Sequence, residues 1–190
     1  MEAILVAIGA VTLAEMGDKT QLLAFILASR FKRPWPVIWG ILVATIFNHS
    51  LACAVGAWIS SLFSPETIKW ILVVSFLAMA VWILIPDKAD DEDSIAKHSM
   101  RFGVFGITFI TFFLAEMGDK TQIATVALTM KYGSPYLVVI GTTIGMLLAD
   151  VPAVWLGDKL AEKIPMKVVR FSSAALFAII GLLAAFEYSP

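Results

Sequence analysis

The chain has 190 residues, of which 59% are hydrophobic and 15% charged, and its formal net charge is −1. Soluble domains are about half apolar and about a quarter charged, so this composition argues against an ordinary water-soluble protein. The balanced charge gives no reason to expect nucleic acid as a partner. Cys53 is the single cysteine, which excludes an intrachain disulfide and a zinc site built from cysteines.

Long apolar stretches predict an all-α membrane protein with six transmembrane helices. Each stretch is about 20 residues or longer, the length that crosses a bilayer as a helix. The N-terminal stretch lacks a basic region before it and carries Glu2, so we interpret it as a spanning helix rather than a cleaved signal peptide. The predicted spans are Ala3–Ser29, Pro36–Leu62, Thr67–Ile85, Phe102–Met130, Pro135–Gly157 and Val168–Phe186.

The positions of lysine and arginine predict the orientation of these spans. Connections on the cytoplasmic side carry the excess of basic residues. Lys69 and Lys131 alone fall on one side, whereas the first, third and fifth connections hold the larger basic group. We therefore expect a multi-pass protein of the cell membrane, the inner membrane of a bacterium, with both termini outside. The larger group comprises Arg30, Lys32, Arg33, Lys88, Lys97, Arg101, Lys159, Lys163, Lys167 and Arg170.

The sequence repeats itself at an offset of 101 positions. The segment LAEMGDKTQ occupies Leu13–Gln21 and again Leu114–Gln122. The same offset aligns Gly40 with Gly141, and Lys69 with Arg170. The match extends through all three spans of each half and indicates a duplication.

The duplication predicts two inverted repeats. Because each copy has three spans, the second copy enters the membrane from the opposite side. We expect repeats at residues 1–85 and 102–190, joined by an acidic cytoplasmic connection at residues 86–101. Inverted repeats are typical of transporters, with the substrate site near the midplane where the repeats meet.

The first and fourth spans are longer than a straight crossing requires. A tilted helix explains this length, and so does a helix broken at Gly17 and Gly118. The sequence leaves both alternatives open.

The repeated segment carries the chemistry of the predicted site. Each ionisable group at the bilayer centre costs roughly 2.5–3.5 kcal/mol, so six of them require partners or a ligand. At helical spacing Glu15, Asp18 and Gln21 share an arc of about 120°. Oxygen ligands suit hard divalent cations such as Ca²⁺, Mg²⁺ and Mn²⁺. The candidate metal ligands are Glu15, Asp18, Gln21, Glu116, Asp119 and Gln122, supported by the hydroxyls of Thr20 and Thr121.

An internal salt bridge is the structural alternative. Glu15 and Lys19 stand four positions apart, as do Glu116 and Lys120, the favourable order for an ion pair on a helix. Two lysines against four carboxylates nevertheless leave a net charge of −2. A dry site does not keep such a charge uncompensated, so we expect a cation or protons to balance it, in competition with each other.

The doubled motif resembles a known family. Two copies of E-x-G-D-K/R-T/S, one in each three-helix half, are similar to the small bacterial manganese exporters of the MneA type. Their relatives are Golgi calcium/manganese transporters within a calcium:cation antiporter superfamily. The motif residues match position by position, and the similarity covers the whole chain. The resemblance implies export of a divalent cation, Mn²⁺ or Ca²⁺, with protons as counter-ion and no cofactor.

Three further polar residues lie inside predicted spans. Asn48 and His49 fall in the middle of the second span, and Asp150 falls opposite His49 in the fifth. They fit side chains that orient the metal ligands, or a path for protons. Hydrogen bonding between helices explains them equally well.

Two other functions fit parts of the motif. The Gly-Asp pairs at Asp18 and Asp119 resemble those of intramembrane aspartyl proteases, which need two carboxylates sharing a proton. The adjacent Glu15 and Glu116 would spoil such a dyad, so we do not expect an enzyme. A divalent cation channel would use the same ligands as a transporter. The expected partners are the metal ion and the lipid bilayer; whether copies associate into a homo-oligomer stays open.

Overall fold

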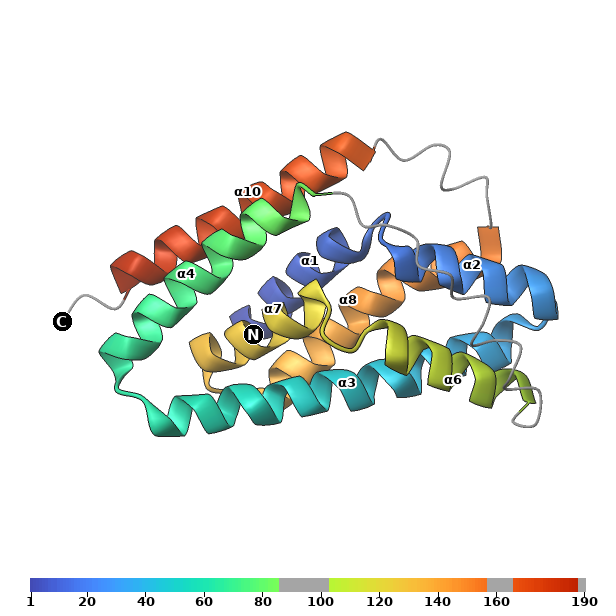
Figure 1. Ribbon diagram of the computed structural model, residues 1–190, viewed down its shortest axis with the longest axis horizontal. Coiled ribbons are helices and arrows are strands. Elements are labelled where there is room, and N and C mark those ends of the chain that lie inside the picture. The colour runs from blue at the N-terminus through green and yellow to red at the C-terminus, as the bar shows by residue number, and fades with distance from the viewer. Residues whose placement is uncertain (86–102, 157–165, 188–190) are drawn as a thin grey trace.

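The computed structural model describes residues 1–85, 103–156 and 166–187. Within these ranges the chain forms helices and no strands, which agrees with the predicted all-α class (Figure 1). The predicted connection at residues 86–101 lies outside the described residues. The helices are α1 Glu2–Glu15, α2 Lys19–Phe31, α3 Pro34–Leu62, α4 Pro65–Ile83, α6 Gly103–Ala115, α7 Lys120–Tyr132, α8 Pro135–Leu156 and α10 Met166–Glu187.

Four of these helices, α3, α4, α8 and α10, are long and apolar enough to cross a membrane. They coincide with the second, third, fifth and sixth predicted spans to within about two residues. Proline sets where α3 and α4 begin, because its missing N–H is not needed in the first turn. Ser64 adds a side-chain cap to α4 by accepting a hydrogen bond from the backbone N–H of Thr67.

The first and fourth predicted spans are each two helices rather than one. α1 ends at Glu15 and α2 begins at Lys19, while α6 ends at Ala115 and α7 begins at Lys120. The break passes through Gly17 at φ 80° and Gly118 at φ 79°, a left-handed conformation that glycine adopts without steric cost. Of the two alternatives that the sequence leaves open, the broken helix is therefore confirmed.

Close contacts between helices centre on glycines. A Cβ on Gly40 of α3 would lie 2.6 Å from the Cβ of Thr108 of α6, and one on Gly141 of α8 would lie 2.8 Å from the Cβ of Ala7 of α1. Small residues allow such close packing in membrane bundles. Thr108 and Ala7 are themselves 101 positions apart. The two contacts are thus equivalent between the halves of the chain.

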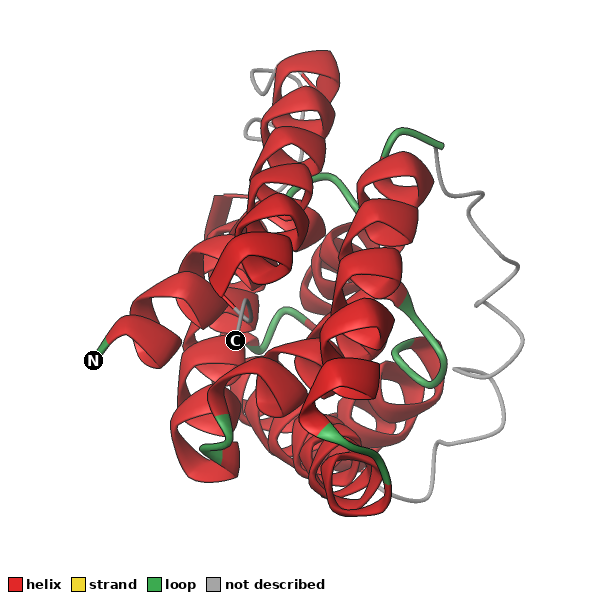
Figure 2. Ribbon diagram, turned by 90° about the vertical axis from the view of Figure 1, so that its left-hand side faces the viewer, coloured by secondary structure: helices red, strands yellow, loops and turns green. Residues whose placement is uncertain are grey.

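The helices form two groups in space (Figures 1 and 2). In one group α3 packs against α6, α7 and α8, and α8 packs against α1 and α2. In the other α4 lies alongside α10, with the rings of Phe76 and Phe177 6.2 Å apart. This α4–α10 pair covers α1 and α7. The two breaks lie inside the first group, next to the end of the pair.

Candidate metal centre

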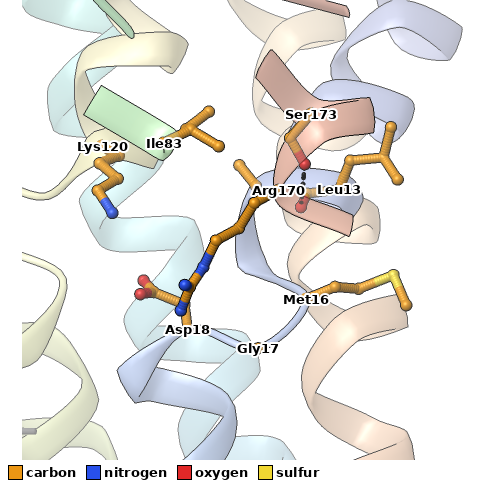
Figure 3. Close-up of a pocket in the computed structure, with 9 residues that line it drawn as sticks. Leu13, Met16, Gly17, Asp18, Ile83, Lys120, Arg170 and Ser173 are labelled. Atoms are coloured by element: carbon orange, nitrogen blue, oxygen red, sulfur yellow. Dashed lines mark hydrogen bonds between the residues drawn. The ribbon is translucent and has the colours of Figure 1, made fainter. Parts of the chain in front are cut away.

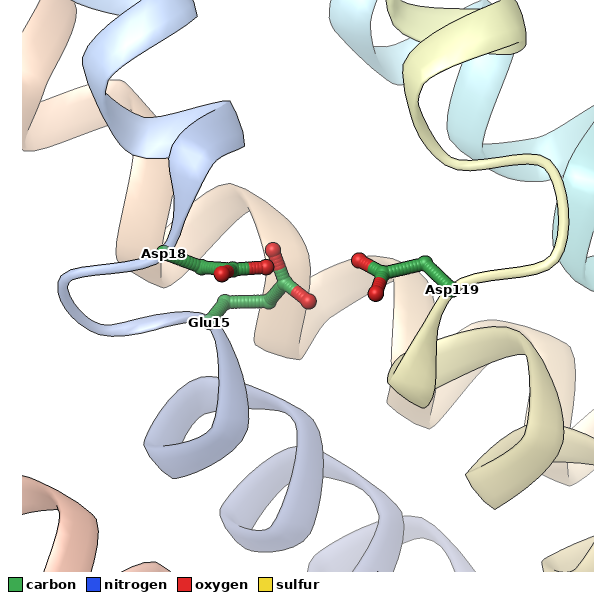
Figure 4. A group of neighbouring side chains, drawn as sticks. All are labelled: Glu15, Asp18 and Asp119. Carbon is green, nitrogen blue, oxygen red and sulfur yellow. The ribbon is translucent and has the colours of Figure 1, made fainter. Parts of the chain in front are cut away.

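The two helix breaks bring carboxylates from both motif copies together. Glu15 ends α1, and Asp18 and Asp119 cap the starts of α2 and α7. One oxygen from each of these three side chains lies within 4.8 Å of the others. Figure 4 shows the three carboxylates pointing toward one another across the gap between the breaks. A single cation between them would contact both halves of the chain.

These carboxylates are buried. Glu15 is 0% exposed and Glu116 is 2% exposed. Glu15 lies within electrostatic range of Glu116, Asp119 and Asp150, and Glu116 within range of Asp18 as well as Asp119 and Asp150. Mutual repulsion among five acidic groups in an apolar interior calls for positive charge or protons at the same place.

Each glutamate is fixed by a threonine of its own motif copy. The hydroxyl of Thr20 donates to Oε2 of Glu15 at 2.7 Å, and the hydroxyl of Thr121 donates to Oε2 of Glu116 at 3.0 Å. In both residues Oε1 is buried and accepts no hydrogen bond from the described residues. One oxygen is therefore oriented by the protein and the other is available to a cation.

Gln21 and Gln122 stabilise the two helix breaks through hydrogen bonds. Oε1 of Gln21 accepts from the backbone N–H of Gly17 at 2.9 Å, and Oε1 of Gln122 accepts from that of Gly118 at 2.7 Å. Nε2 of Gln21 also donates to the carbonyl of Ala149. The sequence predicts these amide oxygens as metal ligands, and in the structure each accepts a backbone N–H. A broken helix leaves such N–H groups without their usual acceptors.

The two aspartates sit at helix N-termini. Asp18 and Asp119 have nearly equal backbone angles, φ −81° and −80° with ψ 170° and 172°. Oδ1 of Asp119 accepts from the N–H of Lys120, and its Oδ2 is buried without a hydrogen-bond donor in the described part of the chain. Each aspartate side chain thus lies beside the positive end of a helix dipole, a position that suits an acidic residue or a bound anion.

The motif lysines do not occupy equivalent surroundings. The ammonium of Lys120 lies 5.9 Å from the centre of the Trp82 ring, and Lys120 lines a pocket together with Asp18. Lys19, the first residue of α2, is half-buried. Arg170 of α10 lines the same pocket, and Figure 3 shows its guanidinium pointing toward Asp18. The sequence analysis counted Arg170 among the basic residues of the fifth connection and did not expect it at the site; the structure places it in α10, facing the pocket.

The three supporting residues differ in their relation to the site. Asp150 is fully buried and within electrostatic range of Glu15 and Glu116, so it belongs to the acidic cluster. Asn48 donates from Nδ2 to the carbonyl of Phe113, a bond between α3 and α6. His49 is buried, and neither ring nitrogen has a hydrogen-bond partner among the described residues.

Taken together, the fold and site define a class: a multi-pass helical membrane protein that gathers carboxylates for a hard cation inside its bundle. The chain belongs to the family described as "Divalent cation/proton antiporter GDT1", whose model matches residues 3–91 and 104–189. This membership confirms the resemblance found in the doubled motif. The family consists of transporters rather than enzymes, which removes the protease alternative.

Relatives match along nearly the whole chain. A Vibrio cholerae protein named "Putative manganese exporter" is 49% identical over 98% of this chain and 92% of its own length. A GDT1-like protein of Synechocystis is 28% identical over 92% of both chains. GDT1-like protein 5 of Arabidopsis thaliana is 28% identical over 90% of this chain and 89% of its own. No solved structure matches.

Proposed function

We propose that this protein is a secondary transporter that exports Mn²⁺ from the cell in exchange for protons, and that Ca²⁺ can replace Mn²⁺ at the same site. The ligands are the carboxylates of Glu15, Asp18, Glu116 and Asp119, two from each half. The observation that carries the proposal is the convergence of Glu15, Asp18 and Asp119, with oxygens within 4.8 Å of one another in a buried position.

Equivalent details in the two halves support an inverted repeat of six spans, with α1–α2 and α6–α7 each forming one broken span. Gly17 and Gly118 share a φ angle, and each donates its N–H to a glutamine four residues on. The close contacts at Gly40 and Gly141 are likewise equivalent. We assign the repeats to residues 1–85 and 102–190, with residues 86–101 and the other basic connections in the cytoplasm of a bacterial cell.

Charge balance supports proton coupling. If the metal leaves, four carboxylates and Asp150 remain in an apolar interior with Lys19 and Lys120 as the motif cations. Protons can neutralise the remaining charge, so metal and protons occupy the cluster in alternation. Asp150 is our candidate for a residue that takes up a proton without binding the metal directly, because it lies in the cluster but outside the motif.

Manganese is proposed ahead of calcium on the strength of the relative that carries manganese in its name. The oxygen ligands alone suit both ions. A methionine thioether from each motif copy would be a soft ligand favouring Mn²⁺, but the two methionines lie in different places. Met16 lines the Asp18 pocket, whereas Met117 is 54% exposed. Gln21 and Gln122, whose oxygens hold the breaks, are proposed as residues that position the ligands.

Transport by inverted membrane vesicles tests the proposal. Vesicles containing the protein should take up Mn²⁺ when their interior is acidic, and should take up Ca²⁺ more slowly. Collapsing the proton gradient should stop accumulation. Accumulation that ignores the gradient and does not saturate with Mn²⁺ would instead identify a channel with the same ligands.

A further inference from the structure

The pocket beside Asp18 contains a cation that the motif does not supply. Arg170 lies in α10, and its side chain reaches into the pocket formed at the break between α1 and α2 (Figure 3). α10 is held there by Ser173, whose hydroxyl donates to the carbonyl of Leu13 at 2.6 Å. Arginine stays protonated under all ordinary conditions and matches the geometry of a carboxylate. A guanidinium at this position brings a permanent positive charge to the pocket that Asp18 lines.

The second aspartate has a different neighbourhood. Lys69 is the residue that aligns with Arg170, and each stands four positions after the first residue of its helix, Pro65 of α4 or Met166 of α10. In this structure the ammonium of Lys69 lies 5.8 Å from the centre of the Trp70 ring. Arg170 therefore faces the motif aspartate of the other half, and Lys69 has a different contact.

Helix packing differs in the same sense. Between the halves, α8 of the second half packs on α1 and α2 of the first, and α3 of the first half packs on α6 and α7 of the second. These two sets of contacts are equivalent. The α4–α10 pair breaks the symmetry: α10 packs on α1 and α4 packs on α7, but in the described ranges neither α10 with α2 nor α4 with α6 forms a comparable contact. The pair thus sits toward one end of the bundle. Because the two halves are equivalent, a symmetry-related packing position for the α4–α10 pair exists at the other end of the bundle.

We propose that Arg170 and Lys69 are cations that alternate at the site: Arg170 faces Asp18 in the state seen here, and Lys69 faces Asp119 in the opposite state. The inference rests on the proposed function and adds the residues that stabilise the metal-free site. The basic side chain offsets the negative charge of the metal-free carboxylates while the α4–α10 pair moves between its two packing positions. It also gives way to the metal when the metal binds.

Metal binding to the purified full chain tests the role of Arg170. In the variant Arg170→Gln the competing charge is lost, so we expect the Kd for Mn²⁺ to fall by roughly tenfold, within the range typical of coupled binding events. Exchange of Mn²⁺ in liposomes should slow, because the vacated site has lost its counter-charge. Arg170→Lys should restore both values toward those of the unaltered protein.

Lys167 provides the matched control, since it is an exposed basic residue one turn earlier on α10. Lys167→Gln removes the same charge and should leave the Kd unchanged. An Arg170→Gln variant that binds Mn²⁺ no more tightly than Lys167→Gln would overturn the inference. If Glu15→Gln abolishes binding in the same assay, that result would leave the proposed function standing, so the two failures are distinguishable.

Cross-linking tests the opposite state. Leu13 and Ser173 are in contact here, and the equivalent pair is Leu114 and Leu72. In a Cys53→Ala background, cysteines at either pair should react with a short bifunctional reagent, and each cross-link should arrest exchange. Lys69→Gln should reduce cross-linking of the Leu72–Leu114 pair and increase that of the Leu13–Ser173 pair. Failure of the Leu72–Leu114 pair to react during active exchange would contradict a second packing position of the α4–α10 pair.

Discussion

In Glu15 and Glu116 the two carboxylate oxygens have the same pair of surroundings. One oxygen accepts from a threonine hydroxyl, and the other is buried without a donor from the described residues. Replacement by glutamine keeps the size and the threonine contact but removes the charge. We expect Glu15→Gln and Glu116→Gln each to lower Mn²⁺ transport by at least roughly 100-fold. Loss of a residue that only hydrogen-bonds a metal ligand already costs up to about 100-fold, and loss of a ligand should cost more.

Both variants should still insert and fold, which gel filtration in detergent can check. Comparable losses from the two halves are expected because their surroundings match. Asp18→Asn and Asp119→Asn should behave in the same way. A large loss in one half and normal transport in the other would show that the metal site is not shared between the halves.

The salt-bridge alternative makes a different prediction for a double substitution. If Glu15 and Lys19 only neutralise each other, removing both charges should restore function, since no unpaired charge remains. If Glu15 is a ligand, the variant Glu15→Gln, Lys19→Met should stay inactive. Vesicle uptake of Mn²⁺ distinguishes the two, and full activity of the double variant would mean that the motif only joins helices.

At the level of helices, the breaks depend on two glycines in the left-handed conformation. A Cβ at Gly118 would have no heavy atom within 4 Å apart from its chain neighbours, so the cost of a side chain there comes from the backbone alone. We expect Gly118→Ala to destabilise the protein by about 1–2 kcal/mol, and Gly118→Asn to cost less because asparagine tolerates this conformation. Thermal unfolding in detergent measures both.

Gly9 supplies the control for that comparison. It lies within α1, and a Cβ added there also meets nothing within 4 Å. Gly9→Ala should be neutral or stabilising by up to about 1 kcal/mol, because alanine favours a regular helix. Equal effects of alanine at positions 9 and 118 would argue against the break as a stable feature of the fold.

The helix breaks could be predicted only in part from the sequence. The repeated segment, its carboxylates and the four long helices follow from residue types and spacing. Helical periodicity does not distinguish a tilted span from a broken one, and so the role of Gln21 and Gln122 was not predictable. Their oxygens accept N–H groups that only the broken backbone leaves free. Arg170 was missed because its approach to Asp18 depends on how α10 packs.

For the molecule as a whole, the proposed inverted repeat makes a prediction about sidedness. Basic residues place the connection near position 92 in the cytoplasm, and those near positions 66 and 133 outside. Single cysteines introduced there into a Cys53→Ala background should react with an impermeant reagent from those sides only. Because the two halves are inverted, positions 66 and 133 must share a side; labelling from opposite sides would contradict the inversion.

In the proposed function, a divalent metal and protons compete for one cluster of carboxylates. Calorimetric titration of the purified protein with Mn²⁺, in buffers with different heats of ionisation, measures the protons released by binding. We expect proton release on binding and an affinity that weakens as the pH falls from about 8 to about 5.5, because ligand carboxylates must lose their protons. Glu116→Gln should remove the binding heat. Mn²⁺ binding with no proton release and with the same affinity across that pH range would contradict competition between the metal and protons.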